Sequence, residues 1–210
     1  MSETRDRDQL AALGRSLFER NLTHGSTGNL SIRIGDGFLM TPTGCALGSL
    51  DPARLSRLDA GGAHIGGDAP TKEAAVHLAM YRQRPSDRAV IHLHSVHSVA
   101  VSVLGDTDPD NALPPLTAYF AMRIGTLPML PYFLPGDAAL AEAVGRAAAR
   151  HHALLLANHG PVVSGATLLT AADAIEELEA TARLWLLVRR ENVRPLTAEQ
   201  LADIARRHPR

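Results

Sequence analysis

The chain has 210 residues and a mass of 22.4 kDa, with 45% hydrophobic residues and a formal net charge of −1. This length suits one domain that buries roughly 70% of the surface of the unfolded chain, and the composition excludes a disordered protein. Because acidic and basic residues balance without long runs of like charge, the sequence argues against a polybasic surface for nucleic acid or membranes.

Cysteine usage and the start of the chain bear on location. Cys45 is the only cysteine, so no disulfide can form within the chain. The first residues, MSETRDRDQL, are charged where a secretory signal is apolar, and no apolar run reaches the roughly 18 residues of a membrane helix. We therefore expect a cytoplasmic protein whose partner is neither a membrane nor a nucleic acid.

Hydrophobic periodicity and turn residues predict the elements of the first part of the chain. In order, they are a helix over 7–20, a glycine-rich loop, strands over 31–34 and 38–40, a turn over 41–44, a short helix over 51–58, a hairpin or loop over 59–68, and a helix over 71–84. Thr71 is expected to cap the last of these helices, which places Lys72 and Glu73 in its first turn.

The second part of the chain continues the alternation of strands and helices. The expected elements are a strand over 89–93, a helix over 95–104, loops with short strands over 105–137, helices over 137–150 and 166–190 around a strand over 153–157, and one more helix after 195. The loop region holds six of the 13 prolines. No repeat or linker interrupts this order, so we expect a single α/β domain over residues 1–210, with strand directions left open by these patterns.

Ten histidines are the unusual part of the composition, and two of them have the spacing of metal ligands. His92 and His94 lie two apart on a predicted strand, so their side chains point to one face with roots roughly 7 Å apart. One ion could bridge the two imidazoles. An ordinary pair of core or surface histidines explains the same pattern equally well.

A third histidine strengthens the metal hypothesis. His159 follows the predicted strand 153–157, and functional groups of α/β folds collect at strand ends. Three imidazoles with an open position describe a catalytic site, and without a nearby cysteine zinc is the first choice, with manganese, cobalt or iron also compatible. His97 is expected to lie outside the ligand set. The remaining histidines have no comparable pattern: His24, His64, His77, His151, His152 and His208.

The same region offers an acid/base group and donors for an anion. Glu73 could ligate the metal and transfer protons, although the helix dipole alone also explains a carboxylate in a first turn. Six residues at turns or helix starts offer amide and side-chain donors that could cradle a phosphate, although each alone could be an ordinary turn residue. These six are Gly28, Asn29, Thr43, Gly44, Thr71 and Lys72.

Taken together, the motifs at 28–33, 41–44, 70–73, 92–94 and 158–160 resemble, in order and spacing, the class II aldolase/adducin family. The resemblance implies a zinc-type ion on His92, His94 and His159, with Glu73 as resting ligand and catalytic acid/base. It implies that the six donor residues bind a substrate phosphate. It also implies a central, mostly antiparallel sheet between helix layers, and a homotetramer with active sites at subunit interfaces.

Further stretches are similar to one branch of that family, which decarboxylates 3-oxo-tetronate 4-phosphates in the breakdown of four-carbon sugar acids. They are residues 113–120, 123–125, 130–137 and 176–185. In that branch a metal-held enediolate is left when CO2 departs, and its protonation by Glu73 would give dihydroxyacetone phosphate. The resemblance thus implies a carboxy-lyase acting on a phosphorylated sugar acid.

Lys72 departs from the small hydroxyl residue that the sugar-phosphate aldolases of the family carry at this position. We expect it to hold the phosphate or to offset the second negative charge of the substrate; a solvated lysine is the alternative.

An aldehyde-lyase of the L-fuculose- or L-ribulose-phosphate type is the second functional hypothesis. A non-catalytic adducin-like module is the third, although the complete ligand set favours an enzyme. Tyr119, in the proline-rich loop region of the branch-specific stretch, is a candidate to assist protonation, although a packing role is expected of it.

Overall fold

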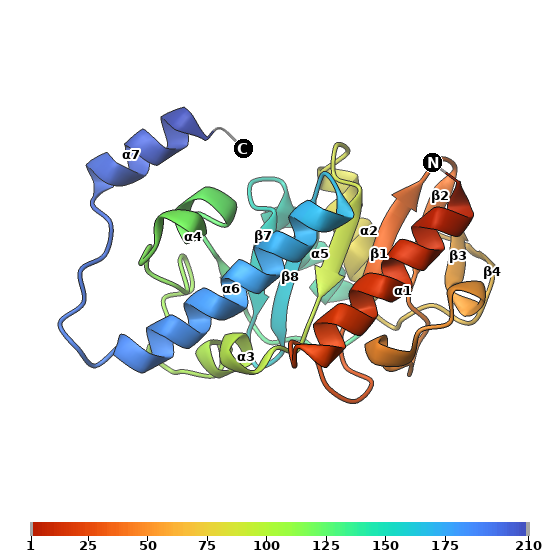
Figure 1. Ribbon diagram of the computed structural model, residues 1–210, viewed down its shortest axis with the longest axis horizontal. Helices are drawn as coiled ribbons and strands as arrows, with labels where there is room; N and C mark the ends of the chain where they lie inside the picture. The colour runs from red at the N-terminus through yellow and green to blue at the C-terminus, as the bar shows by residue number, and fades with distance from the viewer. Residues whose placement is uncertain (1, 209–210) are drawn as a thin grey trace.

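The computed structural model describes residues 2–208 and is built on one eight-stranded sheet (Figure 1). The strand order is β4-β3-β2-β1-β5-β8-β7-β6; β6 and β7 run parallel, whereas the other neighbouring pairs are antiparallel. The bounds are β1 Asn29–Ile34, β2 Gly37–Met40, β3 Ser56–Asp59, β4 His64–Gly66, β5 Ala89–His92, β6 Met129–Leu130, β7 Ala153–Leu156 and β8 Gly160–Gly165. The mostly antiparallel sheet expected from the resemblance is confirmed.

Helices cover both faces of the sheet, as the resemblance also implied (Figure 1). One layer contains α1 (Glu3–Glu19), α3 (Val96–Ser102), α4 (Ala118–Arg123) and α6 (Leu168–Val188), and the other contains α2 (Ala74–Gln83) and α5 (Ala138–Ala148). Two cores result, because alternate strand residues face opposite layers: Ile91 packs in the first core and Val90 in the second. Each fully buried large apolar side chain contributes about 1.5–3 kcal/mol to folding.

Strand β1 has one apolar face and one polar face. Leu30, Ile32 and Ile34 belong to the core under α1 and α6. The alternate residues Asn29 and Ser31 therefore face the layer of α2, where they are buried. This polar strip beneath a helix positions the functional site.

Three local predictions were wrong. The helix expected over 51–58 is only a 3-10 turn over Pro52–Arg54, because Ser56 already pairs with Met40 as the start of β3. The region expected as loops contains α4, whose first turn is capped by the Thr117 hydroxyl, which accepts from the backbone N–H of Phe120 at 3.1 Å. Strand β8 was not expected, since Gly160 and Pro161 suggest a turn; pairing with both β5 and β7 outweighs that tendency.

The start of α2 also differs from the prediction. The helix begins at Ala74 and its N-cap is Glu73, not Thr71. The backbone N–H of Thr71 donates to the Thr41 carbonyl at 3.2 Å, so Thr71 belongs to the link with the 41–44 turn. Glu73 consequently stands at the very end of the helix, where its side chain can leave the helix surface.

The helix expected after residue 195 is α7 (Ala198–Arg207), and every one of its residues is at least partly exposed. It projects from the body at the left of Figure 1 and contacts α4.

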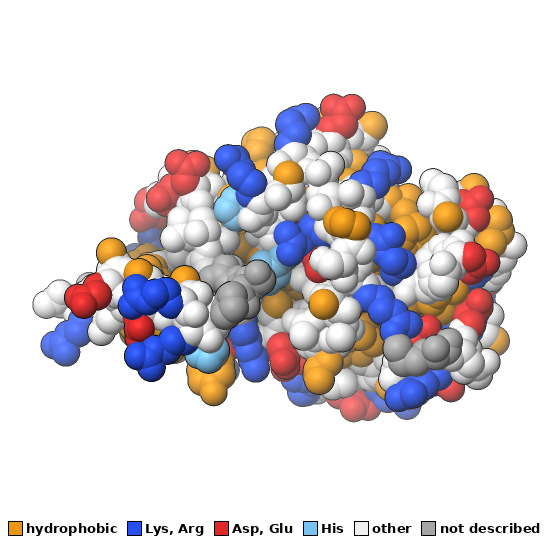
Figure 2. Space-filling model, turned by 90° about the horizontal axis from the view of Figure 1, so that it is seen from above, with side chains coloured by type: hydrophobic (Ala, Val, Ile, Leu, Met, Phe, Trp, Pro, Cys, Tyr) orange, Lys and Arg blue, Asp and Glu red, His pale blue; other side chains and the backbone are white. Residues whose placement is uncertain are grey.

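Acidic and basic side chains are interspersed over the face seen in Figure 2. Among residues 2–208, no helix is long and apolar enough to cross a membrane.

Candidate metal centre

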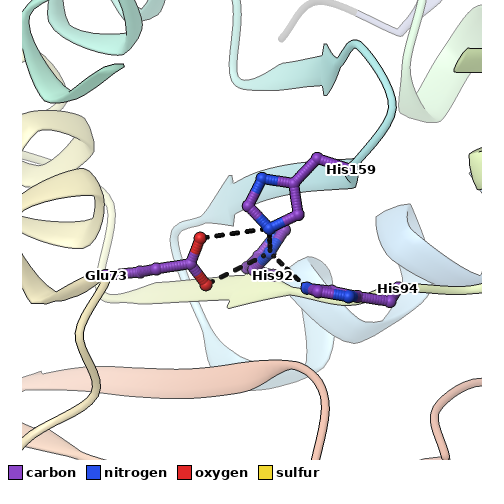
Figure 3. Close-up of side chains that lie close together, drawn as sticks. All are labelled: Glu73, His92, His94 and His159. Carbon is purple, nitrogen blue, oxygen red and sulfur yellow. Dashed lines mark hydrogen bonds and ion pairs between the residues drawn. The ribbon is translucent and has the colours of Figure 1, made fainter. Parts of the chain in front are cut away.

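Four side chains converge on one point between the sheet and α2 (Figure 3). They are Glu73, His92, His94 and His159, and their ligand atoms all lie within 4.8 Å of one another. The Nε2 atom of His92 lies 3.1 Å from that of His94 and 3.3 Å from that of His159. The two carboxylate oxygens of Glu73 lie 3.3 Å from Nε2 of His92 and 3.2 Å from Nε2 of His159. The sequence prediction of three histidines and a carboxylate in one cluster agrees with this geometry.

Different elements supply the four groups. His92 is the last residue of β5, and His94 lies just beyond the strand end. His159 comes from the turn between β7 and β8, and Glu73 from the start of α2. Because β8 pairs with β5 and runs antiparallel to it, the β7–β8 turn lies beside the end of β5. The sheet register therefore brings His159 to His92.

Backbone geometry at Asn158 and Gly160 places His159 so close to β5. Asn158 has a positive φ of 57°, a conformation that asparagine tolerates better than most residues. Gly160 has φ 149°, and a Cβ atom there would lie only 2.3 Å from the carbonyl oxygen of Leu93. A side chain at Gly160 would push the turn away from the histidines, so glycine is required by close approach.

Hydrogen bonding fixes which nitrogen of His92 faces the centre. Its Nδ1 lies 2.9 Å from the carbonyl oxygen of Pro161, an acceptor, so Nδ1 carries the proton and Nε2 presents its lone pair. Burial, followed by the neighbouring histidines, lowers the pKa of His94 to about 3, and burial together with His92 lowers that of His159 to about 4. Neutral imidazoles are the ligand form of histidine.

The donor set fits a divalent cation. Glu73 is buried, and burial opposes its ionisation, whereas the hydrogen bond that its carboxylate accepts from Asn29 favours the ionised form and lowers its pKa. Its Oε1 atom has no hydrogen-bond partner among residues 2–208. An ionised oxygen and imidazole lone pairs that face one another within 4.8 Å repel unless a cation lies between them. The four residues could therefore hold a metal ion of the zinc type.

A buried hydrogen-bonded network supports Glu73 from behind. The Nδ2 group of Asn29 donates to Oε2 of Glu73 at 2.8 Å, and Oδ1 of Asn29 lies 2.5 Å from Nε2 of His77. Burial, with a smaller contribution from His92, lowers the pKa of His77 to about 3. Sequence reasoning missed His77. The signal was the spacing of four between Glu73, His77 and Tyr81, which sets all three on one face of α2.

Three of the residues predicted to bind phosphate adjoin the metal centre. Gly28 has φ 79°, and a Cβ atom there would lie 3.0 Å from the carbonyl oxygen of His92. Asn29 is buried, and its side chain is already engaged by Glu73 and His77. Thr71 is also buried, and its hydroxyl accepts from the backbone N–H of Glu73 at 3.3 Å.

The other three predicted phosphate residues are exposed on neighbouring loops. Thr43 and Gly44 lie in the 41–44 turn, which is tied to the approach to α2 by the hydrogen bond from the Thr43 N–H to the Ala69 carbonyl at 3.0 Å. Lys72 is exposed next to Glu73. A Cβ atom at Gly136 would lie 3.4 Å from the carbonyl oxygen of Lys72, so the 130–137 stretch runs past this lysine.

Two further predictions concern residues outside the cluster. His97 is not among the four clustered residues, as expected; its Nδ1 lies 2.7 Å from Oε1 of Glu179. The packing role expected of Tyr119 is wrong. Its side chain is 60% exposed on α4, with the Arg123 guanidinium 5.5 Å from the ring centre.

Comparisons with known proteins agree with this architecture. The model of the family "Class II Aldolase and Adducin N-terminal domain" matches residues 8–186. A 3-oxo-tetronate 4-phosphate decarboxylase of Pectobacterium atrosepticum is 46% identical over 97% of this chain and 94% of its own. An L-fuculose phosphate aldolase of Escherichia coli is 34% identical over 87% of this chain and 84% of its own.

A solved structure is also similar to this chain over nearly the whole length of both proteins. The crystal structure of YgbL, a putative aldolase/epimerase/decarboxylase from Escherichia coli, superposes with a TM-score of 0.94 at 44% identity. The match covers 96% of this chain and 98% of that chain.

Proposed function

The chain belongs to the class II aldolase and adducin family, and from this premise we propose that it is a metal-dependent carboxy-lyase. Its substrate is a 3-oxo-tetronate 4-phosphate, and its products are dihydroxyacetone phosphate and CO2. The observation that carries the proposal is the contrast between relatives: 46% identity to a decarboxylase over nearly the whole chain, against 34% to an L-fuculose phosphate aldolase. The reaction belongs to the catabolism of four-carbon sugar acids.

The chemistry needs stabilisation of one developing charge and delivery of one proton. The bond between C1 and C2 breaks, C1 leaves as CO2, and the electron pair spreads over C2 and the oxygen on C3. A divalent ion on the four clustered residues, Zn²⁺ ahead of Mn²⁺ or Co²⁺, supplies Lewis-acid stabilisation of that oxygen. A proton added at C2 then completes dihydroxyacetone phosphate.

Glu73 is the group that carries this proton. Its carboxylate is buried and is aimed into the centre by the 2.8 Å hydrogen bond from Asn29. As a resting metal ligand it would be ionised before the reaction, so it must take up a proton during turnover, with water as the final source.

The composition of the chain sets Lys72 apart from the other basic residues as a candidate for binding the phosphate. It is the only lysine in the chain, whose other 20 basic residues are arginines. An ammonium group is a compact point charge with three donors, whereas a guanidinium is a planar fork. We assign Lys72, together with Gly28, Thr43, Gly44 and Thr71, to the phosphate end of the substrate, whereas the side-chain amide of Asn29, the sixth predicted residue, is engaged by Glu73 and His77. Their loops meet at the start of α2, beside Glu73.

We also propose an oligomeric state and a cellular location for the protein. Exposed apolar side chains such as Val96, Leu169 and Leu187, each at least 60% exposed, support association into a homotetramer. A cytoplasmic location, and the lack of a nucleic-acid or membrane partner, stay predictions from the composition.

Product analysis tests the proposed function. The Zn²⁺-loaded protein is incubated separately with 3-oxo-tetronate 4-phosphate, L-fuculose phosphate and L-ribulose phosphate, and CO2, dihydroxyacetone phosphate and aldehyde are each measured. We expect CO2 and dihydroxyacetone phosphate from the first substrate. Aldehyde without CO2 would assign the aldolase reaction instead, which the 34% identical relative makes the second candidate. No turnover of any substrate would favour the adducin-like module.

A further inference from the structure

Strand β1 and helix α2 face each other through a line of buried polar groups. Asn29 and Ser31 alternate on β1, while Glu73, His77 and Tyr81 follow at intervals of four along α2. The contacts run from one end to the other without a gap: Glu73 Oε2 to Asn29 Nδ2 at 2.8 Å, and Asn29 Oδ1 to His77 Nε2 at 2.5 Å. Then His77 Nδ1 meets Ser31 Oγ at 2.7 Å, and Ser31 Oγ meets the Tyr81 hydroxyl at 2.9 Å.

The carboxylate at one end fixes the direction of every hydrogen bond in the line. An ionised carboxylate only accepts, so Asn29 must turn its amide N–H toward Glu73 and its oxygen toward His77. That oxygen only accepts, so Nε2 of His77 must be the protonated nitrogen. The other ring nitrogen then accepts from the Ser31 hydroxyl, and Ser31 in turn accepts from Tyr81.

The end of the line away from Glu73 is held by packing. His77 and Ser31 are fully buried, and Tyr81 is 2% exposed. The Tyr81 ring stacks on Phe38 with ring centres 4.9 Å apart, and the Arg33 guanidinium lies 4.8 Å from its centre. Each member can therefore rotate only if its neighbours also change partners, and a fully satisfied buried network resists such a change.

We propose that His77 is a positioning residue for Glu73: as the Nε2–H tautomer it fixes the Asn29 amide, and that amide holds the Glu73 carboxylate at the metal and the substrate. The inference deepens the proposed function and rests on it for the catalytic consequence. Without the His77 donor, the Asn29 amide can flip and turn its oxygen toward the carboxylate. Glu73 would then be repelled from the place where it ligates and delivers a proton.

Two amide substitutions at this position separate the proposed role from simple packing. In His77→Gln, the side-chain amide nitrogen reaches the place of Nε2 and can still donate to Asn29, while the contact with Ser31 is lost. In His77→Asn, the shorter amide reaches the place of Nδ1, so it keeps Ser31 and loses Asn29. Both variants bury one amide and remove one neighbour, so their thermal stabilities should fall by similar amounts.

Two measurements are made on the wild type and both variants, and a third on the wild type alone. They are Zn²⁺ affinity by competition with a chelating dye, kcat and KM for CO2 release from 3-oxo-tetronate 4-phosphate, and the ¹⁵N spectrum of the His77 ring in the wild type. We expect His77→Asn to lose about 10- to 100-fold in Zn²⁺ affinity or kcat, the usual cost of removing a partner of a metal ligand, with little change in KM. His77→Gln should retain most of both, and the spectrum should show a protonated Nε2.

The outcomes keep this inference apart from the proposed function. If the wild type releases no CO2, the function is wrong, and the comparison of Zn²⁺ affinities and the tautomer still decide the role of His77. Zn²⁺ affinities and turnover that are equal in the two variants would overturn the inference, as would a wild-type ring protonated on Nδ1 alone. A merely structural His77 predicts that both variants decline in parallel with their melting temperatures.

Discussion

The metal centre and the exposed part of the set assigned to the phosphate, Thr43, Gly44 and Lys72, are held in opposite ways. Glu73, His92 and His159 are buried, and hydrogen bonds or the sheet register fix each of them. Thr43, Gly44 and Lys72, by contrast, are exposed on loops. The contrast suggests that the chemistry is fixed before substrate arrives, while the substrate end is free to adapt. Changes in the centre should therefore affect metal content and kcat, and changes in the loops should affect KM.

Removing a ligand should have the largest effect. His92→Ala takes away the imidazole whose lone pair is fixed by Pro161, and leaves a cavity among the remaining ligands. We expect loss of bound Zn²⁺ and a loss of kcat of more than about 1,000-fold, measured by elemental analysis and CO2 release. His64→Ala, at an exposed histidine of β4, is the matched control and should keep both. A fully active His92→Ala variant would show that the four clustered residues are not a catalytic metal centre.

Substituting the carboxylate should separate ligation from proton transfer. Glu73→Gln keeps the size of the side chain and one oxygen donor but cannot carry the proton. We expect part of the Zn²⁺ to remain while kcat falls by about 100- to 10,000-fold, the usual range for loss of a general acid/base. Single-turnover rates measured at saturating Zn²⁺ provide the test. Unchanged turnover at full metal loading would mean that another group protonates C2.

A backbone change should damage the centre without touching a ligand. In Gly160→Ala, the new methyl group meets the Leu93 carbonyl oxygen at 2.3 Å, so the turn that carries His159 must move. We expect a loss of stability of about 1–3 kcal/mol and at least tenfold weaker Zn²⁺ binding. Gly105→Ala, where a Cβ atom has nothing within 4 Å, is the control. Equal Zn²⁺ affinity in the two variants would show that the centre tolerates movement of His159.

The smallest effect is expected on the loop side. Lys72→Ser should raise KM for the phosphorylated substrate by about two- to fivefold, the size of one exposed charged contact, and leave bound Zn²⁺ unchanged. Lys72→Arg keeps the charge and should fall between the wild type and the serine variant. Steady-state kinetics of the wild type and the two variants test whether the charge at position 72 contributes to substrate binding. A KM that does not respond to serine would make Lys72 an ordinary solvated lysine.

The sequence was sufficient for those parts of the site that depend on local spacing. His92 and His94, two residues apart at the end of a short apolar segment, were predicted together, and their Nε2 atoms do meet. His159 was predicted as the third member. The reason for its proximity was not predictable, because it depends on β8, whose Gly-Pro start suggests a turn and whose strand character comes only from pairing with β5 and β7.

Roles that depend on contacts between distant segments could not be predicted from spacing. No second histidine lies at metal-ligand spacing from His77 in the sequence. Its proposed role can be inferred only from its contacts with Asn29 and Ser31, which form because β1 lies under α2. Asn29 was assigned to the phosphate, but its amide is engaged by Glu73 and His77, a pairing across 44 and 48 residues. The helix expected over 51–58 failed for the same kind of reason, since pairing with β2 outweighs local propensity there.

The fate of the substrate carboxylate decides between decarboxylation and any other reaction at this centre. The Zn²⁺-loaded wild type is mixed with 3-oxo-tetronate 4-phosphate that carries ¹³C in its carboxylate, in D2O, and the products are followed by carbon and proton NMR. We expect all of the label to leave as CO2 or bicarbonate, in a one-to-one ratio with dihydroxyacetone phosphate that carries one deuterium on its hydroxymethyl carbon. Label that remains in an organic product would contradict it.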